Sequence, residues 1–85
     1  MKTLINDLIK LIETARVLGL NENDLKNAKD FLDHMEFGLC LDTIITQMYE
    51  YDLEIDNDVY GLISKIGERM DLEMSTYSFM KELIR

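Results

Sequence analysis

A string of carboxylates and tyrosines in the middle of the chain has the residue types and spacing that first suggest chemistry. It consists of Tyr49, Glu50, Tyr51, Asp52, Glu54, Asp56, Asp58 and Tyr60, with no intervening Lys or Arg. Alternating acids can bind calcium, and Asp52, Glu54 and Asp56 match the first three ligand positions of an EF-hand loop. The position of the required glycine is Asn57, however, and the position of the bidentate glutamate is Ile63. The sequence therefore does not predict a calcium site.

The single histidine and the single cysteine give no better candidate for catalysis. A metal site at His34 would need a second histidine or converging carboxylates, and Glu36, two residues away, does not face it on a helix. Cys40 and His34 are six residues apart in different predicted helices, and no orienting group accompanies them. We expect His34 to hydrogen-bond a backbone carbonyl and Cys40 to be a small core residue. The sequence predicts no enzyme, metal site or cofactor.

The same acidic string is better explained as a protein-binding face. Tyrosines bury a large area at little entropic cost, and carboxylates steer a basic partner and raise its association rate. In the alternative explanation, Tyr51 and Tyr60 fill the edge of the core while the acids cap the fourth helix. Five acids within nine residues exceed what capping requires, so the string favours a binding face.

The composition limits the class of protein. The 85 residues are expected to form one domain, residues 1–85, with 47% hydrophobic residues and no proline. The net charge of −8 makes direct binding of nucleic acid unfavourable and favours a basic protein surface as partner. One cysteine excludes an internal disulfide, no apolar run could span a bilayer, and the N-terminus does not resemble a signal peptide. These features together predict a cytoplasmic protein.

Hydrophobic periodicity predicts an all-α fold, a compact antiparallel bundle of four to five short helices. The first helix follows Thr3 as N-cap and ends at Gly19, and the second begins at Asn21 and includes Met35 on its apolar side. After a junction at 34–38, the third helix covers about 37–51, and a loop with Leu53 and Ile55 as apolar anchors follows it. Asp56 is expected to cap the fourth helix, in which Gly61 and Gly67 suggest close backbone packing. Ser75 or Thr76 is expected to cap a short last helix.

Two stretches of the chain carry a family resemblance. Phe31–Asp42 (FLDHMEFGLCLD) and Met48–Asp52 (MYEYD) together resemble the central motif of the MafI-type immunity proteins, CdiI-like proteins of contact-dependent and polymorphic toxin systems. In that family an aromatic–aliphatic pair, an Asp-His and a Glu-aromatic precede a helix that ends near a glutamate. The resemblance continues in helix order and in the stretch Ile66–Leu72. The sequence departs from the pattern at Met35, where a small residue is expected, and at Ser78-Phe79, where a tryptophan is expected.

The resemblance implies a protein that is not an enzyme and that neutralises a toxin domain inside the producing cell. Related toxins often carry a nuclease domain, including the EndoU-type RNase, whose active site is lined with Lys, Arg and His. The hypothesis is that Glu50–Asp58, with Glu36 and Asp42, presents carboxylates and tyrosines to that basic cleft in a 1:1 complex and excludes RNA. A different class of function is an acidic adaptor or regulator that binds a basic partner other than a toxin. The Asp33-His34-x-Glu36 motif has a purely structural alternative, as the junction of two helices.

Overall fold

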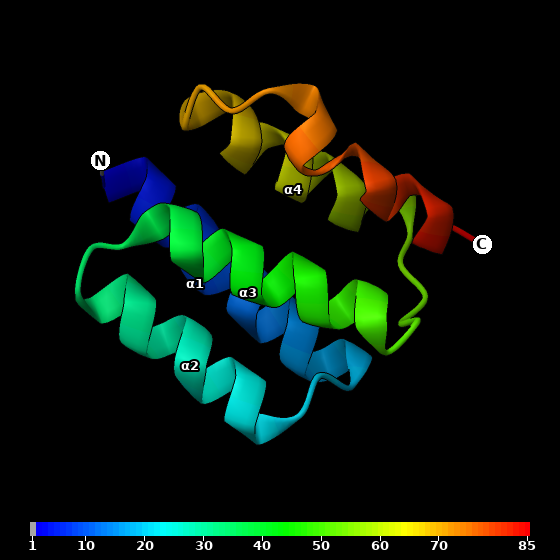
Figure 1. Cartoon of the computed structure of the whole chain (residues 1–85), viewed down its shortest axis with the longest axis horizontal. Coiled ribbons are helices and arrows are strands. Elements are labelled where there is room, and N and C mark those ends of the chain that lie inside the picture. The colour runs from blue at the N-terminus through cyan, green and yellow to red at the C-terminus, as the bar shows by residue number, and fades with distance from the viewer. Residues whose placement is uncertain (1) are drawn as a thin grey trace.

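The computed structural model describes residues 2–85, and these form four α-helices followed by two short 3-10 helices (Figure 1). The elements are α1 (Lys2–Leu18), α2 (Glu22–Asp33), α3 (Phe37–Glu50), α4 (Asn57–Arg69), η1 (Met74–Thr76) and η2 (Ser78–Leu83). The all-α fold class predicted from the periodicity is confirmed. Within residues 2–85, no helix is both long and apolar enough to cross a membrane.

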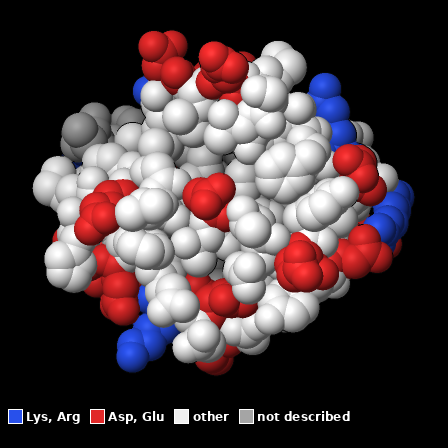
Figure 2. Space-filling view, in the orientation of Figure 1, with Lys and Arg blue, Asp and Glu red and all other residues white. Residues whose placement is uncertain are grey.

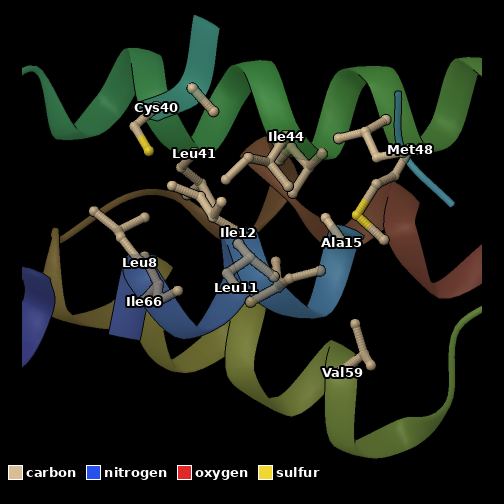
Figure 3. Packing of buried hydrophobic residues seen from close by; sticks show 14 of the residues in the cluster. Leu8, Leu11, Ile12, Ala15, Cys40, Leu41, Ile44, Met48, Val59 and Ile66 are labelled. Carbon is tan, nitrogen blue, oxygen red and sulfur yellow. The ribbon is translucent and has the colours of Figure 1, made fainter. Parts of the chain in front are cut away.

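Helix α1 is the centre of the fold. It packs against the neighbouring pair α2 and α3 and also against α4. Its buried stripe repeats at three- and four-residue spacing, which places the side chains on one face of the helix. Figure 3 shows this stripe between side chains from α3 and from α4; the labelled residues are Leu8, Leu11, Ile12 and Ala15 of α1, Cys40, Leu41, Ile44 and Met48 of α3, and Val59 and Ile66 of α4.

Two of the four predicted N-caps, those of the second and fourth helices, are confirmed. The side chain of Asn21 accepts a hydrogen bond from the backbone N–H of Asp24 at 2.9 Å, and Asp56 accepts one from Val59 N–H at 2.9 Å. Asp24 is itself buried, and it accepts a hydrogen bond from Gln47 of α3 at 3.0 Å, which ties the start of α2 to α3. The prediction for Thr3 is wrong, because this residue lies inside α1.

All four α-helices end in the same backbone arrangement, the Schellman motif. At the end of α2, for example, Glu36 N–H donates to Phe31 C=O at 2.9 Å and Met35 N–H donates to Leu32 C=O at 3.0 Å. The motif requires a left-handed residue just beyond the helix, and these residues are Gly19, Met35, Asp52 and Asp71, with φ of 108°, 58°, 54° and 57°. Glycine carries no steric penalty there, whereas other residues cost about 1–2 kcal/mol.

The C-terminal part differs most from the prediction. Neither Ser75 nor Thr76 caps a last helix; the chain instead makes two 3-10 helices separated by Tyr77. The tyrosine ring is buried against Gly67, where an added Cβ would lie 2.4 Å from ring atom Cε2. Close packing is therefore confirmed at Gly67. The prediction of close packing is wrong for Gly61, which is exposed and has no atom within 4 Å of an added Cβ.

Candidate protein-binding face

The structure divides the acidic string into two groups, of which the first lies at the C-terminal end of α3. There the Tyr49 hydroxyl donates to a Glu82 carboxylate oxygen at 2.9 Å, and its ring packs edge-on against Phe79 with 5.1 Å between centroids. The hydrogen bond to Glu82 raises the pKa of Tyr49 above its ordinary value. Asp52 pairs with Arg85. Residues 49–52 are therefore held against the C-terminal segment.

The loop between α3 and α4 is fixed by the same segment. Ile55 N–H donates to Leu83 C=O at 3.0 Å, and Ile55 forms an isolated parallel bridge with Ile84. Ile55 is buried and Leu53 is half-buried, so the predicted apolar anchors are confirmed. Arg85 lies close enough to Asp52, and secondarily to Glu54, that both carboxylates raise the pKa of its guanidinium. Part of the negative charge of the string is thus neutralised within the fold.

The second group, Asp56 and Asp58, lies at the start of α4 and faces α1. Both residues line a hollow of about 150 Å³ together with Lys10 and Thr14 of α1. Asp56 caps the helix, and Asp58 lies in its first turn, where a carboxylate is favoured by the helix dipole. These two acids therefore have structural roles that account for their position without a partner.

The two outer tyrosines of the string differ in their surroundings. Tyr60 is half-buried, with its ring 6.4 Å from that of Tyr77 and Lys81 Nζ 5.6 Å from its centroid, and burial raises its pKa. It fills the edge of the core, as the structural alternative proposed. Tyr51 does not, because its side chain is 53% exposed.

The outward side of α3 forms a continuous surface that we call the α3 face. It comprises eight of the exposed residues of this helix and of its two flanking turns: Met35, Glu36, Leu39, Asp42, Thr46, Tyr49, Glu50 and Tyr51. Leu39, Asp42, Thr46 and Tyr49 are spaced by three or four residues, so they share one side of the helix, opposite the buried stripe. Glu36, Asp42 and Glu50 form no ion pair within residues 2–85, although Asp42 accepts a 3.4 Å hydrogen bond from Thr46.

The α3 face belongs to a part of the chain that contains acidic residues and no Lys or Arg. No Lys or Arg occurs in residues 30–64, which we call the base-free segment. This segment holds nine of the 17 acidic residues. Figure 2 views the molecule from the side of α3 and shows Asp and Glu spread over this side between wide neutral areas, with Lys and Arg at the rim. A surface of this kind is complementary to a basic partner.

The α3 face also contains exposed apolar residues that the sequence pattern does not predict. Met35 was expected in the core of the second helix, but it lies in the turn after α2 and is 61% exposed. Leu39 is 48% exposed. Among residues 2–85, seven large hydrophobic residues are exposed, and four of them belong to the α3 face. The sequence signal that could have identified them is the base-free segment itself, in which these residues occur outside the buried stripe.

The potentially reactive residues have structural surroundings. His34 Nδ1 lies 2.7 Å from the carbonyl oxygen of Asp30, as predicted for a residue at a helix junction. Cys40 is fully buried, and burial raises the pKa of its thiol to about 11. A thiol with this pKa is protonated at neutral pH and is a poor nucleophile. Residues 2–85 contain no cluster of three or more His, Cys, Asp or Glu residues that could hold a metal ion.

Comparison of the chain with protein-family models, with curated proteins and with solved structures finds no match. The fold and the α3 face define the molecule as a small acidic all-α protein with an exposed surface that lacks bases. This surface is the feature on which a function is best argued.

Proposed function

We propose that this protein is an immunity protein that binds a bacterial toxin domain and neutralises it, with the α3 face as the binding surface. The observation that carries the proposal is the base-free character of this face, where carboxylates without ion pairs alternate with exposed apolar and aromatic side chains. The identity of the partner rests on the resemblance of Phe31–Asp42 and Met48–Asp52 to the MafI-type immunity proteins. In this proposal the protein is not an enzyme, uses no cofactor and acts in the cytoplasm of the producing cell as a 1:1 complex.

The proposed target is a nuclease domain, with an EndoU-type RNase as the leading candidate. A nuclease binds phosphates through Lys, Arg and His, and a carboxylate-bearing surface can occupy the same cationic cleft. The carboxylates of Glu36, Asp42 and Glu50 would accelerate association and fix orientation. Leu39, Tyr49 and Tyr51 would supply the buried apolar area that slows dissociation.

The dimensions of the α3 face are adequate for this role. A helix of 14 residues is ~21 Å long at 1.5 Å per residue, and its two flanking turns extend the surface further. Stable interfaces bury ~800 Å² per partner over about 20–30 residues. The α3 face would therefore form the centre of such an interface, and the exposed residues around it would form the rim.

The proposal is tested by co-expressing the protein with the C-terminal domain encoded by the gene immediately upstream. We expect that domain alone to stop growth and degrade RNA, and that co-expression restores growth and intact RNA, with both proteins in one complex. The toxin assignment would be contradicted if the upstream-encoded domain is harmless alone, or if it stays toxic on co-expression and forms no complex with this protein. The α3 face would then belong to an acidic adaptor with another basic partner.

The position of the interface is tested with charge reversals that leave the fold unchanged. Asp42→Lys combined with Glu50→Lys removes two exposed carboxylates that neither cap a helix nor form an ion pair within residues 2–85. We expect the Kd for the toxin domain to rise about 10- to 100-fold, mainly through slower association. The matched control is Glu68→Lys with Glu73→Lys, which makes the same charge change at exposed positions outside the base-free segment. Equal effects of the two pairs would show a general charge effect and exclude the α3 face.

A further inference from the structure

The turn between α2 and α3 contains a residue that the fold alone does not favour. Met35 has φ of 58° at the position beyond the helix where a Schellman motif usually has Gly or Asn. The corresponding residues of the other three helices are Gly19, Asp52 and Asp71. Glycine is unstrained there, and Asp is among the residues enriched in this conformation, whereas methionine has neither advantage.

Burial does not compensate for this unfavourable conformation. The Met35 side chain is 61% exposed, and Leu39, four residues further on in the first turn of α3, is 48% exposed. Two large apolar side chains thus lie in solvent next to a strained backbone position. Strained backbone positions cluster at functional sites, including those that hold a ligand.

The charges around this pair indicate the chemistry of its partner. Glu36 and Asp42 bracket Leu39 in the sequence, both are exposed, and neither forms an ion pair within the described chain. An apolar centre with a polar, acidic surround is complementary to an apolar recess that is rimmed by Lys or Arg.

We propose that Met35 and Leu39 form the apolar contact through which this protein recognises its partner, inserting into an apolar recess of a basic protein surface. Glu36 and Asp42 then meet the cations at the rim of that recess. This inference rests on the proposed function and adds to it the residues that determine specificity. It assigns the N-terminal end of α3, rather than the acidic string at its C-terminal end, as the main source of affinity.

Met35→Gly gives a test in which stability and binding change in opposite directions. Glycine relieves the left-handed strain, so the midpoint of chemical denaturation should rise, while the Kd for the purified upstream-encoded domain should rise at least 10-fold. Met35→Asn introduces a residue that favours the left-handed conformation without the added flexibility of glycine. It should also weaken binding at least 10-fold, which separates the loss of the methionine side chain from any effect of flexibility. Leu39→Ala should weaken binding by a similar factor.

The matched control is Met74→Ala, because Met74 is also 61% exposed but lies in η1, outside the base-free segment. The Kd of the Met74→Ala variant for the upstream-encoded domain should stay within twofold of the wild-type value. A Met35→Gly protein that is more stable but binds as tightly as wild type would overturn the inference and leave the proposed function intact. Absence of binding by the wild-type protein would instead overturn the proposed function, and this inference with it.

Discussion

Gly61 and Gly67 lie six residues apart on α4, and replacing each with Ala is expected to change the free energy of unfolding in opposite directions. An added Cβ at Gly67 would lie 2.4 Å from the buried Tyr77 ring, so Gly67→Ala should lower the free energy of unfolding by about 1–3 kcal/mol. Gly61 is exposed with open space beside it, and Gly61→Ala should raise the free energy of unfolding by about 0.5–1 kcal/mol. Urea denaturation of both variants checks the pair. Destabilisation by both would show that Gly61 has a packing role.

The buried thiol of Cys40 is expected to make the protein less stable at alkaline pH. Burial raises the pKa of the folded thiol to about 11 from an ordinary value of 9.0. Below pH 9 the thiol is protonated in both the folded and the unfolded state, so it does not make the free energy of unfolding depend on pH. Above pH 9 only the unfolded chain ionises readily, so the free energy of unfolding should fall as the pH rises from 9 towards 11.

Cys40→Ala isolates this effect from the titration of tyrosines and lysines in the same range. The variant should be less stable at neutral pH by about 1 kcal/mol, because a buried sulfur is lost. The difference between wild type and variant should then shrink as the pH rises above 9. A constant difference from pH 8 to 11 would contradict the raised pKa of the Cys40 thiol.

At the scale of the elements, the helix boundaries depend on local interactions such as N-caps. Substitutions of Asp56 can separate its structural role as the N-cap of α4 from a role of its charge. Asp56→Ala removes the cap of α4 and should lower the free energy of unfolding by about 1 kcal/mol. Asp56→Asn keeps a capping oxygen and removes only the charge, so it should be nearly neutral. Denaturation midpoints of the two variants check this. If Asn destabilises as much as Ala, the charge of Asp56 matters more than its hydrogen bond to Val59.

The same distinction explains which elements could be predicted from the sequence. The starts of α2 and α4 were predictable because the capping residues Asn21 and Asp56 act on backbone groups within a few residues. The last helix was not, because the path after Met74 depends on the packing of Tyr77 against Gly67, a contact between segments that local patterns do not encode. Met35 was assigned to the core because its spacing from Phe31 continues the stripe of the second helix, whereas the helix ends at Asp33.

At the scale of the whole molecule, the candidate site was only partly predictable. Residues 49–60 are adjacent in the sequence, but the start of α4 directs Asp56 and Asp58 towards α1, while Tyr49 and Asp52 contact the C-terminal segment. Glu36 and Asp42, which come from another part of the sequence, share the α3 face with Tyr49 and Glu50. Sequence order could not show this division, because it depends on which side of α3 the other helices cover.

The net charge of −8, concentrated in a segment without bases, predicts opposite salt effects on folding and on binding. Added salt screens repulsion among the acids, so the free protein should gain about 1 kcal/mol in unfolding free energy between roughly 20 mM and 300 mM NaCl. Association with a basic domain should slow over the same range, because the same screening weakens electrostatic steering.

Thermal denaturation and stopped-flow association at matched salt concentrations measure the two effects. The Asp42→Lys, Glu50→Lys variant provides the internal comparison, because it removes two of these repelling acids from the α3 face. The salt dependence of folding should become shallower in both this variant and the Glu68→Lys, Glu73→Lys control, because both reduce the net negative charge equally. The salt dependence of association should fall more in this variant than in the control, because only this variant changes the α3 face. If association is independent of salt in the wild-type protein, then apolar contacts such as those of Met35 and Leu39 would have to guide the encounter without electrostatic steering.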